Sequence, residues 1–420
     1  MLRNRRVFLA ATLIDALGSG LWMPFALLFL VHGQGMGLVD AGTSLSTGAL
    51  LALATGPATG AAMDRFGPRA LLVAGNLVRL AAFCAYPLVH TGWQVLVVSL
   101  VAGFGDRLFW TCNAPMVVRL TEGRDTDRVL ATQTVGRFAG AGAGAAATAV
   151  LPTISSQAAF HALAYVNAGS FAVAAVLMGL LPRDKVAGTR EPGVASAGGP
   201  EAVGRPAARK PRPTTWRAVL GDRPFMGFCV THMAFTLASA SKFAVLPIVV
   251  RDLLHGPQWI AGTAITLGTV VVVTGQRPIV ARLAGRSRTA ALIGAAVLFA
   301  VCFALLIPLE IVPLQVATGL ILVTSLGFSV AEAMFGPTGT AAAAAAAAPG
   351  AEGRASSIFQ LSWGLPVALA PGLLAVTLSV SNALTWSVLA LICAAAVPAL
   401  LGLRKNLPAA LREPSPSVAG

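Results

Sequence analysis

The chain has 420 residues, of which 56% are hydrophobic and only 11% are charged, and its mean hydropathy is +0.77. Because a soluble domain carries about 25% charged residues, this composition excludes a protein that faces water over most of its length. The formal net charge of +14 would also suit a nucleic-acid-binding protein, so the positions of the basic residues decide what the charge means.

Apolar runs long enough to cross a bilayer recur along the whole sequence. We expect twelve membrane-spanning helices, at residues 7–31, 43–63, 70–89, 93–117, 130–151, 159–181, 225–250, 259–281, 289–309, 313–339, 355–378 and 382–403. The chain is therefore predicted to be an all-α membrane protein of two pseudo-symmetric six-helix halves, 1–182 and 225–420, the second with a short cytoplasmic tail. The polar stretch between them, 183–224, is predicted to be a cytoplasmic linker with a short helix near Trp216–Leu220.

The basic residues are distributed unevenly between the loops. Most of the 30 Lys and Arg lie at the termini or in the even-numbered loops, whereas Arg251 alone lies in an odd-numbered loop. This asymmetry places both termini in the cytoplasm and the protein in the cell membrane. The positive charge therefore orients the chain in the lipid bilayer and does not indicate nucleic-acid binding.

The segment between the second and third spans, residues 60–69, reads GAAMDRFGPR. A tight loop at the cytoplasmic surface accounts for Arg65 and Arg69 but not for Asp64. The pattern Gly-x-x-x-Asp-Arg-x-Gly-x-Arg resembles the loop between helices 2 and 3 of the major facilitator superfamily of secondary transporters. The resemblance implies a conformational latch in which Asp64 faces the N-terminus of span 11. Its members would be Gly60, Asp64, Arg65, Gly67, Arg69 and Arg354.

A weak internal repeat relates the two halves. Gly105 and Pro115 in the fourth span have the same separation as Gly327 and Pro337 in the tenth. Two parallel six-helix repeats are the architecture of this superfamily, so the repeat supports the same fold.

Ionisable residues at bilayer depth cost about 2.5–3.5 kcal/mol and are functional candidates. Every intramembrane acid of this chain falls on span 1, 4 or 10, and in the superfamily helices 1, 4, 7 and 10 line the central cavity. The candidate residues for proton coupling and the substrate cavity are Asp15, Trp22, Asp106, Arg107, Trp110, Asn113, Arg137, His232, Lys242 and Glu332.

These candidates carry open alternatives. Asp106 and Arg107 lie about 100° apart on a helix, so both cannot face the cavity. His232 fits a packed interior histidine as well as a functional one, and Arg79 is expected to snorkel or to pair structurally. Asp15 and Glu332 are favoured as proton carriers, because an unpaired buried carboxylate is costly and tends to titrate.

Motifs for other chemistries are missing from the sequence. It contains no phosphate-binding loop, no His-Glu-x-x-His and no serine nucleophile elbow, so we do not expect an enzyme. The five cysteines lie in spans without a close pair, so we expect no metal site and no cofactor. Residues 136–144 share the glycines, but not the proline, of a superfamily antiporter motif.

We therefore expect a secondary active transporter that resembles the multidrug efflux antiporters. It would export small amphiphilic compounds by alternating access, as a monomer, with protons or another ion as the coupled partner. The first alternative is uptake or export of a polar metabolite such as a sugar or organic anion. The second is a polytopic membrane enzyme or sensor.

Overall fold

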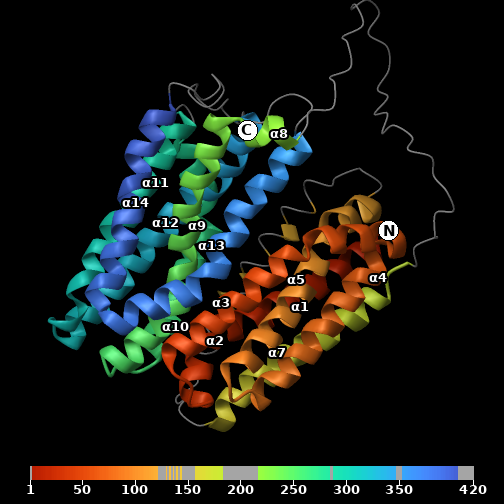
Figure 1. Cartoon of the computed structure of the whole chain (residues 1–420), viewed down its shortest axis with the longest axis horizontal. Helices are drawn as coiled ribbons and strands as arrows, with labels where there is room; N and C mark the ends of the chain where they lie inside the picture. The colour runs from red at the N-terminus through yellow and green to blue at the C-terminus, as the bar shows by residue number, and fades with distance from the viewer. Residues whose placement is uncertain are drawn as a thin grey trace, which may run out of the picture.

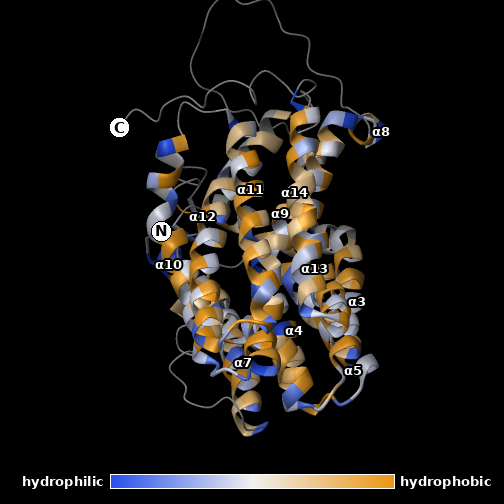
Figure 2. Cartoon of the chain, turned by 90° about the vertical axis from the view of Figure 1, so that its left-hand side faces the viewer, coloured by the Kyte–Doolittle hydropathy of each residue, from blue (hydrophilic) through white to orange (hydrophobic). Residues whose placement is uncertain are grey.

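The computed structural model describes residues 2–121, 157–182, 216–283, 287–346 and 352–404, together with isolated positions between 129 and 143. Figure 1 shows the chain as two helical bundles that lie side by side, one formed by the first part of the sequence and one by the last. In Figure 2 the helices are mostly hydrophobic along their length, with hydrophilic residues gathered toward their ends. This arrangement suits helices that are surrounded by lipid.

The elements of the N-terminal bundle are α1 (Leu2–Trp22), the 3-10 turn η1 (Met23–Phe25), α2 (Ala26–Leu28), the π-helix η2 (Phe29–Gly33), α3 (Leu38–Ala54), α4 (Gly56–Ala85), η3 (Tyr86–Leu88), α5 (Gly92–Thr121) and α7 (Gln157–Gly179). Those of the C-terminal bundle are α8 (Trp216–Leu220), α9 (Arg223–Ile248), the π-helix η4 (Val249–Leu253), α10 (Trp259–Leu283), α11 (Arg288–Leu306), η5 (Ile307–Glu310), α12 (Leu314–Ala346), α13 (Glu352–Val380) and α14 (Asn382–Leu403).

Within the described residues, 10 helices are long and apolar enough to cross a membrane. The helix Leu38–Ala54, with 17 residues, falls just short of that length. The predicted span at 130–151 lies almost entirely outside the described residues. The all-helical, multi-pass membrane fold is thus confirmed, the short helix at Trp216–Leu220 is present, and the count of twelve spans stays a prediction.

The segment predicted as a loop at residues 60–69 is mostly helical, which corrects the sequence-based boundaries. Helix α3 ends at Ala54, and a new helix begins at Gly56 with Pro57 in its first turn, where the missing N–H of proline is not needed. The chain then turns at Gly67, whose φ of 77° and ψ of 160° are accessible only to glycine. The two helical parts of α4 are therefore joined at one residue, Gly67.

The first and seventh predicted spans end with the same unusual geometry. Each ends in a π-helix, at Phe29–Gly33 and Val249–Leu253. Each π-helix is followed by a residue with positive φ, Gly35 (69°) and His255 (48°). Equivalent positions of the two halves therefore have the same backbone geometry here, which supports the internal repeat.

The two bundles contact each other at one end. Helix α3 packs along the middle and C-terminal half of α13: Leu53 lies against Gly364, and Gly42 lies against Pro371 and Ala375 so closely that no side chain would fit. The hydroxyl of Ser46 accepts the N–H of Gly372 (2.7 Å) and donates to the carbonyl of Leu369 (3.3 Å). In Figure 1 this contact lies away from the ends marked N and C. The molecule is therefore closed at the end opposite its termini.

Candidate functional site

A cavity of about 430 Å³ lies between the two bundles. Helices α1, α3, α4, α5 and α7 form one wall, and α9 and α13 form the other. Its aromatic residues come from both halves and are Trp22, Phe83, Tyr86, Phe171, Phe243 and Trp363. A cavity of this size with few polar groups is typical of a small-molecule site.

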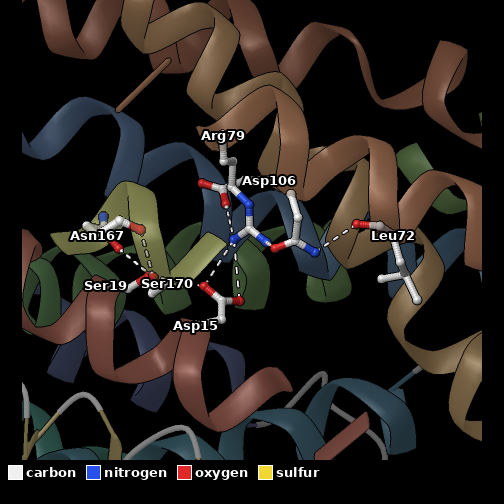
Figure 3. A network of polar contacts seen from close by, with 8 residues as sticks. Asp15, Ser19, Leu72, Arg79, Asp106, Asn167 and Ser170 are labelled. Atoms are coloured by element: carbon white, nitrogen blue, oxygen red, sulfur yellow. Dashed lines mark hydrogen bonds and ion pairs between the residues drawn. The ribbon is translucent and has the colours of Figure 1, made fainter. Parts of the chain in front are cut away.

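One cation organises the polar side of this cavity. Arg79 on α4 lies between two carboxylates, with Nη1 3.3 Å from Oδ1 of Asp15 on α1 and 3.2 Å from Oδ1 of Asp106 on α5 (Figure 3). Its Nη2 donates to the side chain of Asn76 at 2.8 Å. Three spanning helices are thus joined through one guanidinium, whose planar fork suits several acceptors at once.

The surroundings of Arg79 hold its orientation. Its guanidinium lies 4.3 Å from the ring centroid of Phe171 and 5.0 Å from that of Phe109. Asn76 itself donates to the carbonyl of Leu72 at 2.8 Å (Figure 3). Cation–π contacts are strongest when desolvated, and the Arg79 side chain is only 4% exposed, so these rings stabilise its charge inside the membrane.

The two carboxylates of this triad differ in access. The side chain of Asp15 is 1% exposed, whereas that of Asp106 is 47% exposed and lines the cavity. Ser19, which also lines the cavity, donates to Asp15 at 3.3 Å. Asp106 is therefore the carboxylate that a ligand or a proton in the cavity reaches first, and Asp15 is coupled to it through Arg79.

The second pair of predicted residues lies in the C-terminal half. Lys242 on α9 donates to Glu332 on α12 at 2.6 Å, and both side chains are mostly buried. Ser239 lines the cavity and donates to the other oxygen of Glu332 at 3.2 Å. Ser239 thus lies between Glu332 and the cavity. Glu332 is paired with Lys242, whereas the sequence predicted an unpaired carboxylate.

The triad of the N-terminal half has no charged counterpart in the C-terminal half. Asp15 and Phe235 precede the π-helices of their halves by the same number of residues, so they are equivalent positions. In the same way, Arg79 and Ala300 precede the prolines of η3 and η5 by the same number of residues. Asp106 follows Gly105 as Phe328 follows Gly327. Phe235 and Phe328 both contact the ring of Phe299, at centroid distances of 6.4 and 5.9 Å. An aromatic cluster stands where the other half carries charge.

His232 is buried in a cage of aromatic rings. Those within 6.3 Å of its ring are Phe228, Phe235, Phe335, Phe359 and Trp363. Its Nδ1 lies 3.0 Å from the hydroxyl of Ser362, which in turn donates to a backbone carbonyl. Trp363 separates the cage from the cavity, so His232 supports the wall from behind.

The other predicted cavity residues are scattered. Trp110 is half exposed and packs edge-on against Phe109. Asn113 is buried and exchanges two hydrogen bonds with Gln133, at 2.6 and 3.2 Å. Arg107 is not among the residues that line the cavity, and its guanidinium lies close to Gly364 on α13. Arg137 lies outside the described residues.

The predicted latch is only partly described. Arg65 is exposed and lies over the ring of Phe66. Arg69 donates to the carbonyl of Gly179 at the end of α7. The side-chain surroundings of Gly60, Asp64 and Arg354 lie outside the described part of the chain. The latch therefore stays a prediction.

The sequence reasoning missed several residues of the site. Arg79 was expected to snorkel or pair structurally, yet it links the cavity to Asp15. Phe83, one turn further along α4, and Tyr86, at the start of η3, line the same wall. The spacing of Arg79, Phe83 and Tyr86 along one helical face could have indicated this, because it places all three on one side of the third span.

Comparison with known proteins identifies the family. A model of the Major Facilitator Superfamily matches residues 8–371. The chain belongs to the major facilitator superfamily. It is a member of a transporter family and not an enzyme.

Curated relatives of this chain are named for drug resistance. The Multidrug resistance protein MdtH of Aeromonas salmonicida (strain A449) is 26% identical over 278 residues, which cover 65% of this chain and 63% of the relative. The MdtH of Yersinia enterocolitica is 25% identical over 246 residues, 58% of this chain and 56% of the relative. The matches thus span less than two thirds of either relative.

Solved structures share the fold at low sequence identity. A mutant of the nucleoside transporter NupG superimposes with a TM-score of 0.74 at 13% identity, covering 94% of this chain and 99% of that one. A POT family transporter in complex with 5-aminolevulinic acid gives 0.73 at 12%, covering 97% and 96%. These likenesses concern the fold alone.

Proposed function

We propose that this superfamily member has twelve spans and exports small amphiphilic compounds, preferably cations, in exchange for protons. The observation that carries the proposal is the half-exposed carboxylate of Asp106 in a mostly apolar cavity that aromatic rings line from both halves. Aromatic faces bind the apolar or cationic parts of a ligand, and a carboxylate takes either a positive charge or a proton. The multidrug relatives support export.

The charge triad supplies a means of exchange. When Asp106 takes up a proton, it loses its attraction for Arg79, and Arg79 then pairs more fully with Asp15. A cationic substrate that enters the cavity favours the ionised form of Asp106, so substrate and proton compete for one site. Such competition is what an antiporter requires, because each ligand displaces the other.

The contact at the end opposite the termini and the cavity between the bundles together support an inward-facing state of the transport cycle. With both termini in the cytoplasm, the contact of α3 with α13 closes the outer side, and the cavity faces inward. Transport would proceed by rocking of the two bundles about this cavity. The predicted latch at Asp64 would hold the opposite state, so we expect Asp64→Asn to be produced normally but to lose most transport.

Everted membrane vesicles test the proposal. A host stripped of its own exporters would produce wild type, Asp106→Asn or Asp15→Asn, and a pH-sensitive dye would report proton release when a lipophilic cation is added. Wild type should dissipate the gradient and both variants should not, at equal protein level. Asp40→Asn, which removes an exposed carboxylate at the start of α3, is the matched control. A normal response in Asp106→Asn would refute the role of this carboxylate.

A polar metabolite is the second candidate. The solved neighbours include a nucleoside transporter and a transporter in complex with 5-aminolevulinic acid. Arg79 at the cavity wall is the group that would bind an anion. Stabilisation of the purified protein by organic anions, without any effect of lipophilic cations, would favour this alternative.

A further inference from the structure

A second cavity of about 420 Å³ lies on the C-terminal bundle, among α9, α13 and α14. Its walls are almost wholly apolar, with Val230, Ala234 and Leu237 on α9, Leu369 and Leu373 on α13, and Ala395 on α14. The hydroxyl of Thr231, also in the lining, is already donated to the carbonyl of Gly227 at 2.8 Å. This groove therefore offers a ligand hydrocarbon contacts and no free polar group.

The groove opens on a surface that faces lipid. All three helices are among those long and apolar enough to span a membrane. Val230 is 61% exposed and Leu369 is 40% exposed, and neither lines the cavity between the bundles. In a bilayer this surface contacts acyl chains, so hydrocarbon is the material that fills the groove.

Basic residues lie at one end of the groove. Arg223 is on the same face of α9 as Gly227, Val230 and Ala234, at helical spacing. The side chain of Leu403 lies against Gly227, which places Arg404 beside the first turns of α9. Both arginines are exposed, and the nearby carboxylate of Asp222 is engaged in capping α9 through the N–H of Phe225 (3.1 Å).

The short helix α8 extends the same region. It contacts both α9 and α13, and it carries Trp216 and Arg217 on exposed positions. Tryptophan and arginine are the residues that anchor helices at the headgroup level of a bilayer. The end of the groove therefore coincides with an interfacial, positively charged surface.

We propose that the groove binds one acyl chain of an anionic phospholipid, whose phosphate contacts Arg223 and Arg404. Basic surfaces between membrane helices on the cytoplasmic side recognise anionic headgroups, and each buried methylene of the chain adds to affinity. The site is outside the transport cavity and does not depend on the nature of the substrate.

Native mass spectrometry of the purified full chain tests the proposal. The protein would be released from detergent in the presence of equal amounts of phosphatidylglycerol and phosphatidylcholine. We expect wild type to retain phosphatidylglycerol preferentially. Ala395→Phe fills the groove and should abolish retention, whereas Ala394→Phe, at an exposed neighbouring position outside the groove, should not.

The headgroup contact is tested by a second pair of variants. Arg223→Gln should weaken retention of phosphatidylglycerol by about five-fold, whereas Arg282→Gln at the end of α10 should leave it unchanged. Equal retention of both lipids by wild type, or full retention by Ala395→Phe, would overturn the proposal. A loss of transport or of self-association in Ala395→Phe with lipid retention intact would instead make the groove a substrate path or a subunit contact.

Discussion

Nε2 of His32 lies 2.7 Å from Oδ1 of Asp252, and the two residues occupy the same position in the π-helices that end the first and seventh predicted spans. The pair therefore joins the two bundles across their internal repeat, at the closed end of the molecule. Both side chains are partly exposed, 28% and 38%, so the contact is weak and reversible. These properties suit a gate that must open in each cycle.

Removing this pair should shift the protein toward the state open at that end. An exposed ion pair contributes about 0.2–1 kcal/mol, so Asp252→Ala should change the ratio of the two states by up to about five-fold. Spin labels at Val39→Cys and Ser379→Cys, with the five native cysteines replaced by serine, would report the separation of α3 and α13. Glu310→Ala, at the same end of the molecule, should leave the distance distribution unchanged.

Replacement of Gly42 by leucine should prevent closure at the same end. A side chain at this position would collide with Pro371 and Ala375 on α13, so Gly42→Leu should lose most transport and show a long distance between the same spin labels. Gly37 lies one turn earlier with no atom within 4 Å of a built side chain, and Gly37→Leu should behave as wild type. An unchanged distance in Gly42→Leu would contradict the assigned contact.

Loss of Arg79 should destabilise the N-terminal half. Removing one partner of a buried ion pair costs about 3–5 kcal/mol, because a charge is left unpaired, so Arg79→Gln should lower the melting temperature of the purified protein by several degrees. Asp15→Asn in the same background should restore part of the loss. Equal melting temperatures for Arg79→Gln and the double variant would show that Asp15 and Arg79 are not coupled.

Substitution of Gly67 should strain the junction inside α4. Its backbone conformation disfavours every residue with a side chain, at about 1–3 kcal/mol, so Gly67→Ala should reduce thermal stability. Gly56→Ala, at a helical glycine with no atom within 4 Å of the added carbon, should be neutral or stabilising. A thermal unfolding scan of both variants, monitored by tryptophan fluorescence, would decide.

The sequence predicted the fold class well because hydropathy is a local property. Runs of about 20 apolar residues indicate membrane spans, and the family match across residues 8–371 agrees. The turn at Gly67 falls inside the predicted loop at 60–69. The break between α3 and α4 at Thr55 was missed, because Gly56 and Pro57 were read as part of one continuous span.

The candidate site was less predictable, because pairing depends on contacts between distant segments. Asp15 and Asp106 were identified as intramembrane acids, yet nothing local to either shows that Arg79 lies between them. Glu332 and Lys242 were both named as candidates, and their contact also spans two helices far apart in sequence. The arrangement of the charges therefore had to come from the three-dimensional structure.

The triad of Asp15, Arg79 and Asp106 also constrains how the protein enters the membrane. Asp15 lies in a spanning helix that leaves the ribosome before α4, and its cation follows only with α4. Until then the bilayer must accommodate an acid that costs about 2.5–3.5 kcal/mol at the helix centre. Stable insertion of α1 should consequently require that α4 has been synthesised and inserted. The assembly of the N-terminal half therefore depends on the order in which its helices are made.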